Sequence, residues 1–156
     1  MAGGLKAYIK LGKLGGESAK DGRSKDGFHD LLAVSLGGSC NWDFSQEVQP
    51  TRSVGFSGVS ITKYVNGASP ILFIACLKEK LLKEVTIVVE DDKGGDFFYI
   101  RMKDEVRITS DSLSFSGSEM LESVSFTAKT LELEHKAKNK KDDIKWNDIQ
   151  QKGAEI

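Results

Sequence analysis

The sequence predicts a mainly β protein: a small β-barrel, or two packed antiparallel sheets, with one flanking α-helix and one long extended loop. Three observations lead to this fold class. Short segments rich in β-branched and aromatic residues recur along the chain, separated by clusters of Gly, Asp, Ser or Lys. One segment begins like a helix, with Ser-Pro ahead of an apolar run. At 156 residues the chain has the length of a single domain, with a core of about 1–135 and a charged C-terminal segment, 136–156.

Seven segments carry the pattern of strands. Apolar residues alternate with polar ones at Val85, Ile87 and Val89, as in a half-buried strand. In the last segment the apolar positions shift from even to odd numbers at Leu131, so we expect a bulge or bend near Lys129–Thr130. The expected strands are 7–11, 28–36, 58–65, 84–90, 97–103, 106–115 and 123–133.

The helix is predicted within V-S-I-T-K-Y-V-N-G-A-S-P-I-L-F-I-A-C, residues 59–76. Asn66–Gly67 supplies a turn that tolerates positive φ, Ser69 is expected as the N-cap, and Pro70 as the first helical residue. The seven residues Ile71–Leu77 are all apolar, so this helix has no polar face in its first two turns. Because a sheet covers only one side, we expect a loop of the same chain or another subunit to cover the other.

Two segments lack a regular pattern. Residues 41–57 are too many for an ordinary connection and include Trp42, Phe44 and Phe56. These aromatic side chains either fold back on their own domain or dock on a neighbour, and the sequence leaves both open. Residues 136–156 alternate Lys with Asp and Glu around Trp146, which predicts a solvated tail.

Composition argues against several partners. The 22 basic and 23 acidic residues give a net charge of −1, which does not favour nucleic acid. The longest apolar run, Ile71–Leu77, is far below the ~18–20 residues of a membrane-spanning helix, so we expect no membrane insertion. The N-terminus lacks the pattern of a secretory signal peptide.

We predict no catalytic residue, cofactor or metal. His29 and His135 have no Ser, Cys or carboxylate partner at a suggestive spacing. Asp91, Asp92 and Asp96 surround Gly94–Gly95 and predict a hydrated hairpin tip, because their spacing does not match an EF-hand loop. The two cysteines, Cys40 and Cys76, form no C-x-x-C motif and are expected to be free and structural.

Four motifs, in the same order along the chain, resemble the haemolysin-coregulated protein (Hcp) family, the tube subunits of bacterial type VI secretion systems. They are Y-I-K-L-G-K-L-G-G-E-S at 8–18, the strand, T-K-Y and Ser-Pro-led helix at 61–76, the strand from Glu122–Phe126 through Leu131–Leu133, and K-W-N at 145–147. The segment 61–76 is the most specific of the four.

The resemblance implies a β-barrel with the helix on its flank, a homohexameric ring, and rings stacked into a hollow tube. A contractile sheath would expel this tube together with a tip spike protein, and effector proteins would travel in the lumen. The subunit would assemble in the bacterial cytoplasm and be secreted without a signal peptide. Under this resemblance, Pro70, Ile71 and Phe73 are expected at the ring interface, and the ring-stacking loop is expected to use Trp42, Phe44, Arg52 and Phe56.

Two alternatives remain beside this hypothesis. A tail-tube protein of a contractile phage-like particle would have the same architecture. A small ligand-binding barrel would instead gather polar groups in an apolar cavity, for which the sequence offers few candidates.

Overall fold

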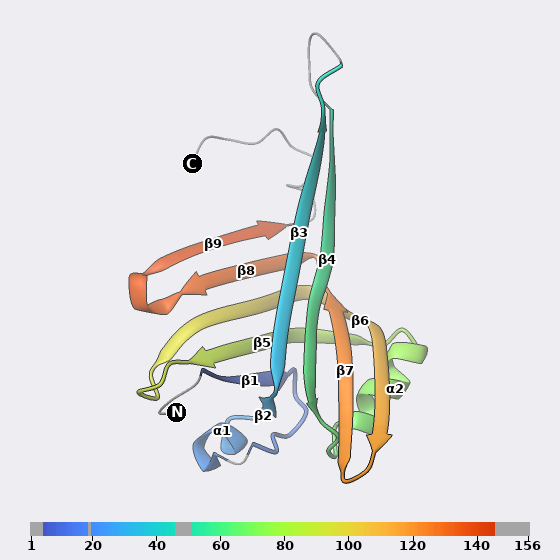
Figure 1. The fold of residues 1–156 in the computed structure, drawn as a ribbon, viewed down its shortest axis with the longest axis vertical. Helices are drawn as coiled ribbons and strands as arrows, with labels where there is room; N and C mark the ends of the chain where they lie inside the picture. Colours follow the sequence, from blue (N-terminus) through green and yellow to red (C-terminus); the bar gives the residue numbers. More distant parts are fainter. Residues whose placement is uncertain (1–4, 19, 46–50, 146–156) are drawn as a thin grey trace.

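The computed structural model describes residues 5–18, 20–45 and 51–145, without the side chains of 21, 41–43, 51–57, 137 and 145. In this part of the chain all strands belong to one antiparallel sheet, in the order β2-β1-β5-β6-β7-β4-β3, with β8 paired to β6 and β9 (Figure 1). The predicted mainly β fold is confirmed, and the described strands form one sheet where the prediction allowed a small barrel or two packed sheets. The strands are β1 (Lys6–Leu11), β2 (Phe28–Leu31), β3 (Ala33–Asp43), β4 (Thr51–Tyr64), β5 (Leu81–Glu90), β6 (Asp96–Ser116), β7 (Glu119–Thr127), β8 (Thr130–His135) and β9 (Lys140–Lys145). The helices are α1 (Asp21–Lys25), α2 (Ser69–Leu77) and the 3-10 helix η1 (Lys136–Lys138).

The sheet curls so that its two end strands follow each other directly in the chain. Strands β2 and β3 lie at opposite ends of the pairing order, yet only Leu32 separates them in the chain. The Leu32 amide donates a hydrogen bond to the carbonyl oxygen of Thr62 on β4, at 2.7 Å. The single strand predicted over 28–36 is therefore divided at Leu32 between the two ends of the sheet.

Strand β6 is long and bent. Along one of its edges it pairs with two successive strands, β7 and β8, and the break between them lies at the bend. Strand β7 pairs with the second half of β6 and β8 with the first half. Between these halves Asp104 and Glu105 have positive φ, and the Lys129 amide donates to the Asp104 carbonyl at 3.1 Å. The bend predicted near Lys129–Thr130 is confirmed, and it lies opposite the gap between the two strands predicted on β6.

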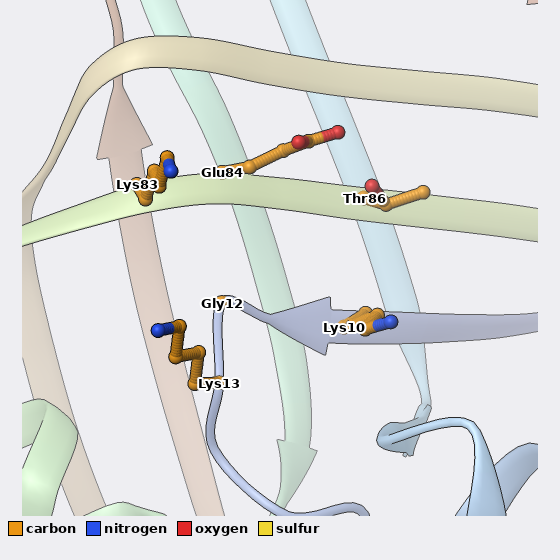
Figure 2. A pocket seen from close by; sticks show the side chains of 6 residues that line it. All are labelled: Lys10, Gly12, Lys13, Lys83, Glu84 and Thr86. Carbon is orange, nitrogen blue, oxygen red and sulfur yellow. The ribbon is translucent and has the colours of Figure 1, made fainter.

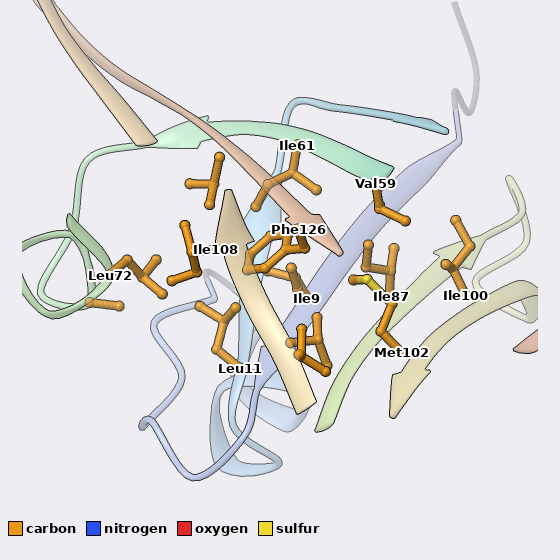
Figure 3. Close-up of a cluster of buried hydrophobic side chains, with 14 of the residues drawn as sticks. Ile9, Leu11, Val59, Ile61, Leu72, Ile87, Ile100, Met102, Ile108 and Phe126 are labelled. Atoms are coloured by element: carbon orange, nitrogen blue, oxygen red, sulfur yellow. The ribbon is translucent and has the colours of Figure 1, made fainter. Parts of the chain in front are cut away.

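The inner face of the curled sheet is filled with apolar side chains. Phe126 lies at the centre of this cluster, and Leu72 brings α2 against it (Figure 3). Both side chains are fully buried, as are Ile9, Ile87 and Met102 from three other strands. Alternation along each strand places these residues on one face, so the core follows directly from the period-two pattern.

The prediction of an irregular loop over 41–57 is wrong, because most of this stretch is strand. Strands β3 and β4 continue as a two-stranded ribbon beyond the rest of the sheet, and we call this ribbon the arm (Figure 1). Its pairing runs from Gly38 opposite Phe56 to Asp43 opposite Thr51. The glycines and polar residues of the arm disguise the strand pattern in the sequence, and cross-strand pairing overrides their low propensity.

The charged C-terminal segment also begins differently from the prediction. Residues 140–145 form β9, which pairs with β8, so that Ile144 lies opposite Leu131. Lys and Asp have low strand propensity, but the open edge of β8 supplies hydrogen-bond partners that an isolated segment lacks. Trp146 and the residues after it lie outside the described part of the chain.

An ion network holds α1 against the outer face of the sheet. The Arg23 guanidinium donates to Glu90 at 2.8 Å and to Asp96 at 2.6 Å, and lies over the rings of Tyr8 and Phe28. Burial alone would raise the pKa of Glu90, but hydrogen bonds from Lys20 and Arg23 outweigh burial and lower it. The pKa of Asp96 is lowered in the same way, against burial, by hydrogen bonds from Tyr99 and Arg23.

We expect Arg23→Gln to lower the free energy of unfolding at neutral pH by about 1.5–3 kcal/mol, the range for hydrogen bonds to charged groups. The two carboxylates have lowered pKa values when folded, so their stabilisation is present above their ordinary values and is lost as pH falls through the lowered ones. The difference from the parent should therefore shrink below about pH 4 in urea unfolding. Lys25→Gln, an exposed change on the same helix, is the control. A difference that stays constant into acid would contradict this interpretation.

Candidate subunit interface

Helix α2 presents apolar side chains both to the core and to the surface. Leu72 and Ala75 are buried, whereas Ile71, Ile74 and Leu77 are 53%, 44% and 67% exposed. None of the nine residues of α2 carries a charge. Since an amphipathic surface helix normally turns polar residues outward, this outer surface has the composition of a buried one.

We call this surface the helix face. It consists of Pro70, Ile71, Phe73, Ile74 and Leu77, and it includes all three residues predicted for the ring helix. Pro70 and Ile71 are exposed, and Phe73 is half-buried. Ile74 and Leu77 were not singled out from the sequence. Ile71, Ile74 and Leu77 follow one another at intervals of three residues, and this spacing could have placed them on one face of the helix.

The start of α2 differs from the prediction. The helix begins at Ser69 and its N-cap residue is Ala68, with no side-chain cap. The Ser69 hydroxyl instead accepts from the Asn66 amide at 3.0 Å and donates to Glu122 Oε1 at 2.7 Å. Gly67 and Asn66 do not have positive φ. The turn is held by Asn66 Oδ1, which accepts from the Ala68 amide at 3.0 Å.

A buried ion pair lies under this helix start. Lys63 Nζ and Glu122 Oε1 are 2.9 Å apart, and neither side chain is exposed. Lys63 also donates to Asn66 Oδ1 at 2.9 Å and to Ser69 at 3.2 Å. A buried pair needs such additional hydrogen bonds to offset its loss of hydration. The network therefore ties α2 to β4 and β7 in one orientation.

His29 belongs to the same network. Its Nδ1 lies 3.0 Å from Asn66 Nδ2, and its Nε2 is buried without a hydrogen-bond partner in the described part of the chain. Burial, and then the charge of Lys63, lower the pKa of His29. The imidazole is therefore neutral, so Nδ1 accepts from the amide of Asn66 and Nε2 carries the hydrogen.

A second exposed apolar patch lies on the β6–β7 hairpin. Phe115 and Met120 lie opposite each other near the end of the β6–β7 hairpin, and they are 65% and 47% exposed. Met120 is two residues from Glu122 on β7, hence on the same side of the strand, and Glu122 accepts from Ser69 of α2. We call this pair the hairpin patch. The sequence did not reveal it, because its position depends on the hairpin register.

The residues predicted for ring stacking lie on the arm, apart from the helix face (Figure 1). On the backbone ladder Trp42 is directly opposite Arg52, and Phe56 is opposite Gly38. Phe44 follows the end of β3 and is 75% exposed. The side chains of Trp42, Arg52 and Phe56 lie outside the described part of the structure.

A surface groove of about 300 Å³ runs beside β1 and β5 (Figure 2). Its lining brings three lysines together with one carboxylate, but all four of these side chains are exposed and no described ion pair orients them. A group that must position a substrate needs such support, so this groove has no assembled site. It is lined by Lys10, Gly12, Lys13, Lys83, Glu84 and Thr86.

Asp91 holds the predicted hairpin tip. At the hairpin tip, Asp91 Oδ1 accepts from the amides of Lys93 and Gly95, both at 2.9 Å, which confirms the predicted turn. No cluster of three or more His, Cys, Asp or Glu in the described residues could hold a metal ion. Cys40 and Cys76 are both free. Over the same residues, none of the helices has the length and apolar content needed to span a bilayer.

The curled sheet and the two apolar patches define a class: a mainly β protein with a helical surface of the kind that subunits present to one another. A family model described as "Type VI secretion system effector, Hcp" matches residues 8–135. The chain belongs to the Hcp family. Among curated proteins, no sequence matches it.

Solved structures agree in fold. Hcp1 from Salmonella typhimurium is 17% identical, with a TM-score of 0.71 over 94% of this chain and 97% of that one. Secreted protein Hcp3 from Pseudomonas aeruginosa is 16% identical, with a TM-score of 0.67 over 92% and 99%. A type VI secretion system effector from Yersinia pestis is 20% identical, with a TM-score of 0.66 over 89% and 98%.

Proposed function

We propose that this chain is a secreted structural subunit of a type VI secretion inner tube, which closes into hexameric rings through α2. The observation that carries the proposal is the helix face: an uncharged, apolar surface on a helix that a buried ion pair holds rigidly. Burying such a face stabilises an assembly by about 25 cal/mol for each Å² of apolar surface. A copy of the same chain supplies a partner at every face and closes the ring by symmetry.

The arm gives the proposal its second contact. A two-stranded ribbon that extends beyond the sheet reaches farther than a compact loop of the same length, because each strand residue adds about 3.3 Å. We propose that the arm, with Trp42, Phe44, Arg52 and Phe56, docks on an adjacent ring and so stacks rings into a hollow tube. The sheath, the tip spike protein and effectors in the lumen are the partners that family membership implies for such a tube.

Ile71→Asp should abolish ring formation. The side chain is half-exposed on α2 and lies outside the core, so aspartate leaves the fold intact but places a charge where the partner must be apolar. We expect the parent to scatter light as a particle near six times 17.1 kDa and to show rings, with stacked side views, by negative-stain imaging. The variant should be monomeric at the same concentration.

Leu5→Asp is the matched control, because Leu5 is also an exposed apolar residue but precedes β1. It should form rings like the parent. If Ile71→Asp still forms rings, α2 is not part of the ring interface. A parent that stays monomeric at all concentrations would overturn the tube proposal itself.

A further inference from the structure

Three ionisable side chains meet on the inner face of the sheet beneath the start of α2. Lys63 lies on β4, Glu122 on β7 and Asp111 on β6, and these strands are neighbours in the sheet. Asp111 is paired with Val124, two residues from Glu122, so the two carboxyl groups share one face. We call Lys63, Glu122, Asp111 and Ser69 the helix seat.

Hydrogen-bond donors in the helix seat are too few for its acceptors. Glu122 Oε1 accepts a hydrogen bond from the Ser69 hydroxyl and forms the ion pair with Lys63. Glu122 Oε2 and both carboxyl oxygens of Asp111 are buried, with no hydrogen-bond partner among the described residues. Two ionised carboxylates cannot satisfy each other, since both only accept. One proton on Asp111 changes this, because the resulting O–H can donate to Glu122 Oε2.

We propose that Asp111 and Glu122 share a proton in the helix seat, and that loss of this proton loosens α2 and weakens subunit association through the helix face. With the proton present, the positive charge of Lys63 and the negative charge of Glu122 cancel. Without it, the seat holds one net negative charge on buried carboxyl oxygens. A buried charge without a partner is strongly destabilising.

The surroundings favour the protonated form. Burial raises the pKa of Asp111 to about 8, together with the hydrogen bond that its protonated form makes to Glu122 and the negative charge of Glu122, while Lys63 lowers it. Helix α2 contributes no charged residue. On β2 and the preceding loop, the other groups near the seat are His29, Asp30 and Glu17, whose carboxylate lies against Gly67. Because the pKa of His29 is lowered from its ordinary value of 6.5, its titration lies below that of Asp111.

The sign of the pH dependence follows from the raised pKa. Between the ordinary value of 3.8 and about 8, the folded chain holds a proton that the unfolded chain has released. The stabilisation is complete below 3.8, declines as pH rises and is exhausted once the folded pKa is passed. Within this window each pH unit lowers the folding equilibrium constant about tenfold on account of this group.

Asp111→Asn tests the shared proton on the fold itself. The asparagine amide can donate to Glu122 Oε2 and does not titrate. In urea unfolding, the ratio of the folding equilibrium constant of the variant to that of the parent should therefore rise about tenfold for each pH unit from about 5 to about 8. Comparing the two chains cancels the contribution of His29. Asp92→Asn, an exposed change at the β5–β6 hairpin, should leave the pH profile of the parent unchanged. Parallel profiles for the parent and Asp111→Asn would overturn the proposal.

Infrared spectroscopy on the parent gives a measurement that needs no variant to fold. A protonated carboxyl group has a C=O stretch separate from that of carboxylates, so a band should be present at neutral pH and disappear as pH rises past about 8. Its absence at neutral pH overturns the proposal.

The step to assembly rests on the proposed ring. Light scattering should show parent rings dissociating as pH rises past about 8, while Asp111→Asn rings persist. Parent rings that are as pH-stable as those of the variant overturn this step. If neither chain forms rings at any pH, the proposed function fails, whereas the unfolding comparison still decides the shared proton separately.

Discussion

Lys63→Met should lower the free energy of unfolding by about 3–5 kcal/mol, the range for breaking a buried ion pair from one side. Methionine fills most of the volume of lysine, so the loss comes from the charge and not from a cavity. Glu122 would then be buried with its charge uncompensated, and it would keep only the hydrogen bond from Ser69 and the one that we propose from protonated Asp111. Urea unfolding at neutral pH measures the change directly.

The double variant Lys63→Met/Glu122→Gln separates charge from packing. Removing both charges should recover most of the loss, because replacing a whole buried pair by neutral groups is often nearly neutral. Lys129→Met breaks the exposed pair of Lys129 with Glu105, 3.0 Å apart, and should cost at most about 1 kcal/mol. If Lys63→Met lowers the free energy of unfolding as little as Lys129→Met does, the ion pair does not hold α2 in place, and the orientation of the helix face must have another cause.

Gly58→Ala is the second change for which we expect a large effect, a loss of several kcal/mol. Gly58 has a φ of +83°, and a Cβ there would lie 2.4 Å from the carbonyl oxygen of Phe126. The oxygen belongs to the backbone of β7 and the Cβ would be fixed directly to the backbone of β4, so neither can move aside cheaply. Left-handed φ costs an alanine roughly 1–2 kcal/mol, and the overlap adds to it.

Gly94→Ala is the matched control for Gly58→Ala. Gly94 has a φ of +82°, but a Cβ there would meet nothing within 4 Å. It should show the cost of φ alone, and the difference between the two variants in thermal unfolding then measures the overlap. Equal losses would show that the strand shifts to accept the Cβ.

Gly58 also marks the point at which the arm leaves the body of the protein. The β3–β4 register shifts by one residue beside it, and the pairing of β4 with β7 begins at the next residue, Val59. Such bulges bend a strand away from its sheet. The backbone at Gly58 thus sets the direction of the arm that we propose for ring stacking.

Alternation was enough to locate most strands and the residues of the core. Val85, Ile87 and Phe126 are buried as their spacing predicts, because alternate residues of a strand face the core of the curled sheet. The bend at Lys129 could also be predicted, because apolar positions that shift from even to odd numbers within a strand require a bulge or bend. The arm was missed because Gly37–Asn41 is glycine-rich and polar, and its strand state depends on the partner strand.

The candidate interface was readable only in part. A run of seven apolar residues in α2 indicates a helix that needs covering on two sides, and that signal led to Pro70, Ile71 and Phe73. The hairpin patch and the helix seat were not visible in this way. Asp111, Glu122 and Lys63 are far apart in the chain and look like ordinary surface charges until the strand registers are known.

By itself, the sequence determined the mainly β class, the apolar helix and, through four ordered motifs, the resemblance to the Hcp family that the match over residues 8–135 confirms. These features are local, because periodicity, turns and motifs lie within a few neighbouring residues. The tertiary structure alone decided the division between β2 and β3 at Leu32, the arm, and the meeting of Lys63, Glu122 and Asp111 under α2. Those depend on which strands pair and in which register, and pairing is a free-energy choice among distant segments that no short stretch of sequence encodes.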